Sequence, residues 1–255
     1  MESLDAILKN RGLLSLDEYE SMITNRSFIS TGHPELDELI SDGNGGLGGI
    51  PRGCITEVFG ATSVGKSRFC KDICARDDVR SLYIDAENSL SAAEFLWLKE
   101  RGVSVISESC IETLWGLLND IIASNELDLI VIDSLAALVT NTELAADNEP
   151  TMATQMSPSK ALTAWMKQLV RSLNGTETAV VFVNHKKFTP GMFSTATTPG
   201  GVAPKFYSSL RLDFSAKKQD LKGSVQKVEV SLAKSRFSPK NTSCKFKLEL
   251  DFNNI

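Results

Sequence analysis

The chain has 255 residues, 42% hydrophobic and 23% charged side chains, and a formal net charge of −5. This composition is typical of a soluble globular protein and excludes collagen-like, coiled-coil and wholly disordered classes. No stretch approaches about 18 uncharged apolar residues, and the N-terminus lacks the basic start of a secretory signal, so we expect no membrane association. Five cysteines without a regular pattern indicate reduced thiols and a cytoplasmic location.

The charge is unevenly distributed along the chain. Residues 184–255 contain 13 Lys or Arg and 5 Asp or Glu, whereas residues 1–183 contain 14 and 27. On this count alone, a basic surface for an anionic partner such as nucleic acid and a fold with one solvated basic face are equally good interpretations.

Residues 1–30 hold two short apolar clusters at helical spacing, separated near Gly12. A segment of this size cannot form its own core. We therefore expect an N-terminal arm over residues 1–30 that packs on the main domain or docks on a neighbouring subunit, and a single core domain over residues 31–255.

From residue 53 onward, short β-rich runs alternate with amphipathic helical patterns. The runs cover residues 54–59, 81–85, 128–133 and 178–183, and the helical patterns cover residues 66–76, 91–101, 111–124 and 159–173. This alternation predicts an α/β fold with a mostly parallel central sheet and helices on both faces. After residue 207 the hydrophobic period changes to two, which predicts antiparallel strands added to the C-terminal side of the same sheet.

A phosphate-binding motif follows the first of these strands. The segment from Gly60 to Ser67 fits G-x-x-x-x-G-K-[ST], between a predicted strand and a predicted helix. In this setting Lys66 would neutralise phosphates and the Ser67 hydroxyl would ligate Mg²⁺. The candidate nucleotide-binding residues are Gly60, Ala61, Thr62, Ser63, Val64, Gly65, Lys66, Ser67 and Arg68. A glycine-rich turn without a ligand is the alternative.

Two acidic residues end neighbouring strands. Asp133 closes a buried apolar run, where a contact with the Mg²⁺ shell would explain a costly carboxylate and helix capping is the alternative. Glu87 follows another strand end. The carboxyl ends of parallel strands line one crevice, so Glu87 can act as the base that orients an attacking water. A solvated loop glutamate is the alternative.

Several motifs occur in the order typical of one family. They are IDAE at residues 84–87, VIDSLAAL at 131–138, VNH at 183–185 and the run MF…TTPGG…KFYSSLRLD at 192–213. With the P-loop, these motifs make the chain resemble RecA-type recombinases. The histidine of VNH is similar to that of phage UvsX-type proteins.

The resemblance implies a RecA-like P-loop core and a DNA-dependent ATPase that uses ATP and Mg²⁺. Such a protein forms helical filaments on single-stranded DNA, with ATP between adjacent subunits, and exchanges strands with homologous duplex DNA in recombination and repair. A single-strand-binding protein or a loader are further candidate partners. Because the sequence stops after the last predicted core strand, we expect the extra C-terminal domain of longer members to be missing.

The resemblance also assigns roles to basic and apolar residues. His185 would sense the γ-phosphate, with a plain loop histidine as the alternative. Residues 186–204 would form the second DNA loop, with a core-packing turn as the alternative, and residues 141–158 the first. The candidate DNA-binding residues are Met156, Lys160, Lys186, Lys187, Met192, Phe193, Gly200 and Gly201.

The resemblance further implies that Lys234 and Arg236 reach the neighbouring subunit's ATP. The candidate catalytic residues are Lys66, Glu87, His185, Lys234 and Arg236, and Phe206 joins the basic pair at the expected subunit interface. An ordinary basic strand end is the alternative for the pair. Ser91 and Glu94 stand where family members place an acid and an aromatic residue near adenine.

Two other functions fit the sequence. The chain could be a recombination mediator that binds ATP and single-stranded DNA and assists another recombinase, or a ring-forming DNA-dependent ATPase. Strand exchange distinguishes the first function from a recombinase, and filaments rather than rings exclude the second.

Overall fold

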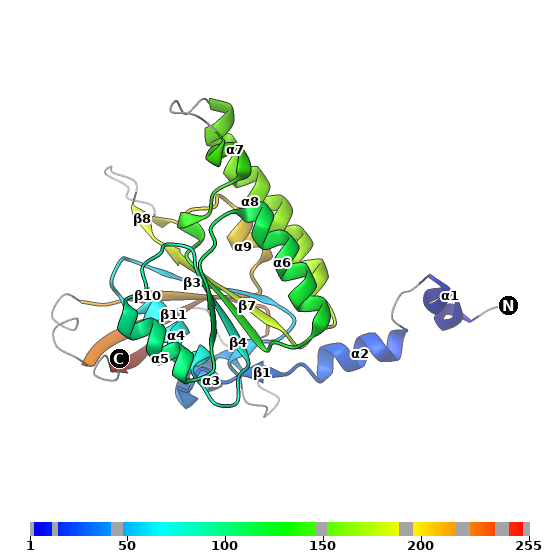
Figure 1. Ribbon diagram of the computed structural model, residues 1–255. Coiled ribbons are helices and arrows are strands. Elements are labelled where there is room, and N and C mark those ends of the chain that lie inside the picture. Colours follow the sequence, from blue (N-terminus) through cyan, green and yellow to red (C-terminus); the bar gives the residue numbers. More distant parts are fainter. Residues whose placement is uncertain are drawn as a thin grey trace.

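The computed structural model describes residues 3–11, 15–41, 48–145, 152–188, 196–217, 225–237 and 245–251. An eight-stranded sheet lies at the centre, with the strand order β12-β11-β10-β3-β7-β6-β4-β5 (Figure 1). Its strands are β3 (Ile55–Gly60), β4 (Ser81–Asp85), β5 (Ser104–Ile106), β6 (Leu129–Asp133), β7 (Ala179–His185), β10 (Leu210–Ser215), β11 (Val225–Ser235) and β12 (Lys245–Asp251). The α/β fold with a mostly parallel sheet is confirmed.

One strand departs from the predicted topology. The run at residues 210–215 was expected to be antiparallel, but β10 lies parallel to β3 and antiparallel only to β11. The antiparallel addition therefore consists of β11 and β12. An alternating pattern reports one buried face, and it does not encode the direction of the neighbouring strand.

Helices cover both faces of the sheet. On one face lie α3 (Pro34–Ile40), α4 (Lys66–Cys74) and α5 (Ala92–Glu100); on the other lie α6 (Ile111–Ser124), α8 (Met152–Leu173) and α9 (Ala203–Tyr207) (Figure 1). Short elements complete the described chain: β1 (Phe28–Ile29), β2 (Ile50–Pro51), a 3-10 turn (Leu135–Ala137), α7 (Asn141–Leu144), β8 (Lys187–Phe188) and β9 (Ala196–Thr197). None of the helices in the described ranges combines the length and apolar character needed to span a bilayer.

Part of the expected first DNA loop is helical. The range 141–158 was predicted as a loop, but α7 occupies its start and α8 begins at Met152, with Pro158 inside the helix. The loop prediction was therefore wrong for these parts. The helical pattern was expected to begin at residue 159, but α8 begins earlier and runs through Pro158, where the proline removes one backbone hydrogen bond without ending the helix.

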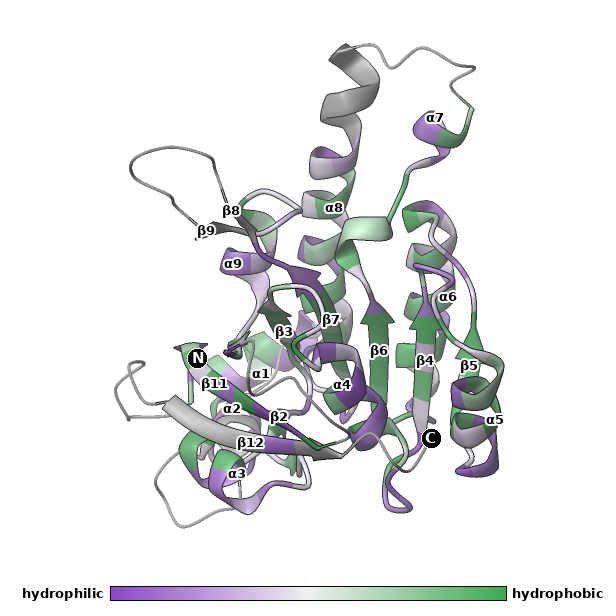
Figure 2. Cartoon of the chain, turned by 90° about the vertical axis from the view of Figure 1, so that its left-hand side faces the viewer, coloured by the Kyte–Doolittle hydropathy of each residue, from purple (hydrophilic) through white to green (hydrophobic). Residues whose placement is uncertain are grey.

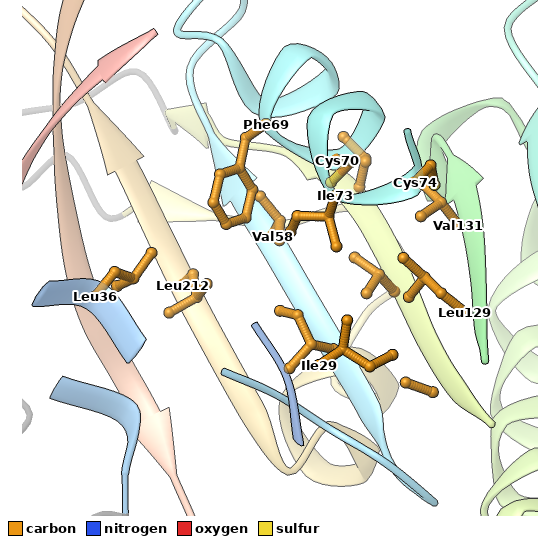
Figure 3. Packing of buried hydrophobic residues seen from close by; sticks show 14 of the residues in the cluster. Ile29, Leu36, Val58, Phe69, Cys70, Ile73, Cys74, Leu129, Val131 and Leu212 are labelled. Atoms are coloured by element: carbon orange, nitrogen blue, oxygen red, sulfur yellow. The ribbon is translucent and has the colours of Figure 1, made fainter. Parts of the chain in front are cut away.

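The buried apolar side chains form one cluster on each face of the sheet. Figure 3 shows Phe69, Cys70 and Ile73 of α4 against Val58 of β3 and Val131 of β6. The helix carrying the phosphate motif is thus held by its buried face against the strands that carry the acidic residues. The hydropathy colouring shows the central strands β4 and β6 mostly green, whereas the helices carry both green and purple residues (Figure 2).

The N-terminal segment contains the two expected helices, α1 (Leu4–Asn10) and α2 (Leu16–Thr24). Figure 1 shows them extending away from the sheet. Helix α1 buries none of its residues, and Leu4 and Tyr19 are more than half exposed. Ser15 precedes α2 and forms a capping box with Glu18, which fixes the start of the helix locally.

Candidate nucleotide-binding site

The P-loop connects β3 to α4 and turns through left-handed backbone. Ser63 has φ 61° and Gly65 has φ 85°, and α4 begins at Lys66. The buried Lys66 Nζ donates a hydrogen bond to the Ala61 carbonyl at 2.7 Å. Burial lowers the pKa of Lys66, and the nearby Asp133 carboxylate opposes this effect. The loop therefore holds a cation at the N-terminus of a helix, the arrangement that phosphate-binding loops use.

Gly60 serves packing as well as the loop. A Cβ atom at this position would lie 2.2 Å from the carbonyl oxygen of Phe214 on β10. No side chain fits there without separating the two strands. The first glycine of the motif is thus required by the sheet itself.

A pocket of about 350 Å³ opens beside the loop. Six of the nine predicted nucleotide-binding residues line it: Thr62, Ser63, Gly65, Lys66, Ser67 and Arg68. Val64 instead packs in the apolar cluster. The remaining lining residues are Lys71, Glu87, Glu94, His185 and Gln226. The predicted motif, the predicted base and the predicted phosphate sensor therefore meet in one cavity.

Asp133 lies at the end of β6, almost completely buried. Burial raises its pKa, while hydrogen bonds from Ser67 and Tyr83 oppose that rise. The Tyr83 hydroxyl donates to Asp133 Oδ2 at 2.6 Å. A buried carboxylate next to a hydroxyl is stabilised by a cation, and these oxygen ligands suit Mg²⁺.

Glu87 forms the centre of a second hydrogen-bonded group. Its Oε1 accepts a hydrogen bond from the Ser134 hydroxyl and lies 3.0 Å from His185 Nε2. Partial burial raises the pKa of Glu87, but the hydrogen bonds from Ser134 and His185 outweigh burial and leave it below its ordinary value. The carboxylate is therefore ionised at neutral pH and able to accept a proton from water.

Part of the pocket lining differs from the family pattern that was noted at Ser91 and Glu94 in the sequence. Lys71 Nζ pairs with the Glu94 carboxylate, and Glu94 also caps α5 through Ser91. Gln226 of β11 reaches the same pocket, and its Oε1 is buried without a hydrogen-bond partner in the described residues. An ion pair and an amide thus stand near the site where an acid and an aromatic residue were expected.

The candidate DNA-binding residues have different outcomes. Lys160 is exposed on α8, and Gly200 and Gly201 turn the chain into α9 with φ of 89° and 68°. Lys186 is folded back on the core, with Nζ 2.6 Å from Asp213 Oδ2, so a DNA phosphate would have to displace Asp213. Met192 and Phe193 lie outside the described residues, as do the side chains of Met156 and Lys187.

The predicted interface residues meet at the C-terminus of α9. Lys234 Nζ donates to the carbonyl oxygens of Lys205 and Phe206, at 2.8 and 3.1 Å, and Arg236 Nη2 donates to that of Phe206 at 3.2 Å. Burial and the nearby Arg236 and Arg211 lower the pKa of Lys234. The Phe206 side chain is 67% exposed. The basic pair therefore does not line the nucleotide pocket of its own chain.

Sequence reasoning missed several residues of the site. Tyr83, which bonds Asp133, lies in the β-rich run at residues 81–85, and Ser134, which bonds Glu87, directly follows the run at residues 128–133; neither was given a role. Glu57 is completely buried in β3 and accepts a hydrogen bond from Asn184. A charged residue inside an otherwise apolar buried strand was the available signal for Glu57.

Comparison with known proteins agrees with this geometry. The family model described as the RecA N-terminal domain matches residues 2–251. The plasmid RecA protein of Lactococcus lactis subsp. lactis is 35% identical over 175 residues, which are 66% of this chain and 50% of that protein. The RecA protein of Rickettsia prowazekii (strain Madrid E) is 34% identical over 226 residues, 83% of this chain and 63% of its own.

The RecA protein of Oleidesulfovibrio alaskensis is 31% identical over 228 residues, 85% of this chain and 63% of that protein. The chain thus spans about half to just under two thirds of the length of these relatives. The family match extends over nearly all of the residues that form the sheet, the P-loop and the basic pair. The chain belongs to the RecA N-terminal domain family.

Proposed function

We propose that this protein is an ATP-dependent recombinase that assembles on single-stranded DNA and exchanges strands with a homologous duplex. The observation that carries the proposal is the meeting of Lys66, Glu87 and His185 in one pocket, together with a basic pair that does not line that pocket. The family relationship supports the same function, since the relatives named above are RecA proteins.

The chain's own groups account for phosphate binding and hydrolysis. The P-loop amides and Lys66 would hold the β- and γ-phosphates of ATP. Ser67 and Asp133 would ligate Mg²⁺, which supplies positive charge to the phosphate oxygens when bound. Glu87 would orient the attacking water and accept its proton, while Ser134 and His185 hold the carboxylate in place.

The basic pair supports a site shared between subunits. Lys234 and Arg236 are held at the end of α9, beside the exposed Phe206. In a head-to-tail assembly, this surface of one protomer would meet the pocket of the next. Cations placed at the γ-phosphate from a neighbour accelerate phosphoryl transfer by about 10³-fold or more. The exposed apolar residues of α1 and α2 would add a docking arm.

DNA would lie along the segments that follow β6 and β7. Both strands end beside the nucleotide pocket, and the regions after them carry the candidate DNA-binding residues. Lysines and backbone amides suit the phosphates of a stretched strand, and sequence is read by base pairing rather than by the protein.

Joint-molecule formation tests the proposal directly. Circular single strand, homologous linear duplex, ATP and Mg²⁺ are incubated with the protein, and products are resolved on agarose. We expect joint molecules with the wild type and none with Lys66→Ala. The absence of product at every protein concentration, with ATP turnover still stimulated by single-stranded DNA, would contradict strand exchange and favour the mediator function.

A further inference from the structure

The last two residues of β7, Asn184 and His185, place their side chains on opposite faces of the sheet. Successive side chains of a strand point to opposite faces. His185 therefore faces α4 and the pocket, where its Nε2 lies 3.0 Å from Glu87 Oε1. Asn184 faces the other way, and its Oδ1 accepts a hydrogen bond from the backbone N–H of His185 at 2.8 Å. A shift of His185 is thus transmitted directly to Asn184.

Asn184 is bonded to a buried carboxylate on that second face. Its Nδ2 donates to Glu57 Oε1 at 2.8 Å and to the carbonyl oxygen of Pro199 at 3.0 Å. Pro199 precedes the glycine pair that leads into α9. Asn184 therefore connects the end of β7 to the returning end of the predicted second DNA loop.

Glu57 is bonded on its other side to a guanidinium. Arg211 Nε donates to Glu57 Oε2 at 2.5 Å, and the Arg211 guanidinium lies over the Phe59 ring at 4.4 Å. Glu57 has no exposed surface. Each of its oxygens thus has a partner, which is the condition under which a buried carboxylate is tolerated.

The polar residues Asn184, Glu57 and Arg211 form a row across the sheet that leads to the basic pair. Arg211 of β10 lies opposite Glu57 of β3 and opposite Lys234 of β11. The register of β10 and β11 shifts between Arg211 and Leu212, because Leu212 faces Leu232 and one residue of β11 is left over. This bulge turns Lys234 onto the face of Arg211, where a regular strand would have pointed it to the other face.

We propose that Glu57 is a positioning residue that couples the γ-phosphate end of the pocket to the second DNA loop, while its pairing with Arg211 holds that guanidinium beside Lys234. The proposal rests on the proposed function, because it concerns the same nucleotide site. Glu57 touches neither ATP nor DNA. It acts by holding Asn184 and Arg211 in one polar row across four adjacent strands, β7, β3, β10 and β11.

Two double variants distinguish coupling by Glu57 from a mere effect on the stability of the fold. Both remove the buried ion pair, and replacement of such a pair is often tolerated. E57Q/R211Q retains an amide oxygen that can accept the Asn184 hydrogen bond, whereas E57M/R211M has no acceptor. The readout is the tightening factor, defined as the Kd for fluorescein-labelled oligo(dT) without nucleotide divided by the Kd with ATPγS and Mg²⁺.

We expect a tightening factor of about 10-fold or more for the wild type and E57Q/R211Q, and of about 2-fold or less for E57M/R211M. The affinity for a fluorescent ATP analogue without DNA should agree within about 3-fold among all three proteins. Equal tightening factors for the two double variants would overturn the coupling role. A wild type without any tightening would instead overturn the proposed function itself.

A third variant covers the case in which E57M/R211M does not fold. Asn184→Ala leaves Glu57 paired with Arg211 and removes the hydrogen bonds that Asn184 makes to Glu57, to the Pro199 carbonyl and to the His185 N–H. We expect it to lose the tightening factor while its melting temperature stays near that of E57Q/R211Q. Retention of the full factor in Asn184→Ala would contradict the coupling role.

Discussion

The phosphate end of the pocket and the Lys234–Arg236 pair are both sites of charge, but they are built differently. Lys66, Asp133 and Glu87 are each held by partners from their own chain, and Lys66 and Glu87 line one cavity. The side chains of the basic pair donate to backbone carbonyls at the end of α9, and neither residue lines that cavity. The phosphate end of the pocket is built from one protomer, whereas under the proposed function the basic pair acts at the pocket of the neighbouring subunit.

The largest effect is expected when the Lys66 cation is removed from the phosphate end of the pocket. Lys66→Ala leaves the phosphates without their buried counter-charge. We expect ATP turnover to fall by about 10³-fold or more. Coupled-enzyme assays with single-stranded DNA measure the change, and Lys99→Ala, an exposed lysine on α5, is the matched control. Unchanged turnover in Lys66→Ala would refute the site.

Glu87→Gln separates binding from hydrolysis. The amide keeps hydrogen bonds to Ser134 and His185 but accepts no proton, so turnover should fall by about 10²- to 10⁴-fold. Binding of a fluorescent ATP analogue should change by less than about 3-fold, because the P-loop is intact. A matched loss of binding would mean that Glu87 holds the nucleotide instead. Glu100→Gln on α5 serves as the control.

The pH dependence of turnover follows from the same carboxylate. The pKa of Glu87 lies below its ordinary value, so the group stays ionised through neutral pH. We expect activity attributable to Glu87 to decline only as the pH falls below about 4.3, the unperturbed glutamate value. Stopped assays between pH 3.5 and 7, in protein shown to remain folded, would measure it. A midpoint near pH 6 would contradict this assignment.

A smaller effect is expected at Asp128, which precedes β6 at the end of the strand away from Asp133. Asp128 bonds Arg52 at 2.8 Å and Arg80 at 2.9 Å, and these arginines hold its pKa well below the ordinary value despite partial burial. Asp128→Asn should lower the free energy of unfolding by about 1–3 kcal/mol at pH 7. Because a lowered pKa stabilises above the unfolded value, the difference should shrink as the pH falls below about 3.9. Urea titrations at pH 7 and pH 3 test this.

The smallest predicted effect concerns DNA phosphates. Lys160 is exposed on α8, near the predicted first loop. Lys160→Ala should weaken binding to oligo(dT) and reduce the slope of log K against log salt by about 1. Anisotropy titrations at several salt concentrations measure the slope. A slope identical to that of Lys99→Ala would remove Lys160 from the interface.

The sequence was most informative where chemistry depends on local spacing. The strand, glycine loop and Lys66 follow one another within a dozen residues, so their geometry follows from the motif. The meeting of Glu87 and His185 also follows, because parallel strands end at one edge. The direction of β10 did not follow, because alternation reports a buried face and says nothing of strand direction.

Long-range partners were the part that the sequence did not predict. Glu57 and Arg211 are 154 positions apart, and their pairing depends on which strand lies next to β3. The bulge that turns Lys234 onto the same face depends on how β10 and β11 align. Periodicity identifies the buried face of each strand, but it does not say which strand lies beside β3 or where a bulge falls.

Mixing two inactive variants tests the shared site most directly. Lys66→Ala retains the basic pair but lacks the phosphate cation, and Arg236→Ala retains the phosphate site but lacks part of the pair. Each alone should be nearly inactive in DNA-stimulated ATP turnover. In an equimolar mixture, about one quarter of random head-to-tail junctions combine an intact pocket with an intact pair, so a comparable fraction of wild-type turnover should return. A mixture no more active than its separate components would contradict a nucleotide site completed by the neighbouring subunit.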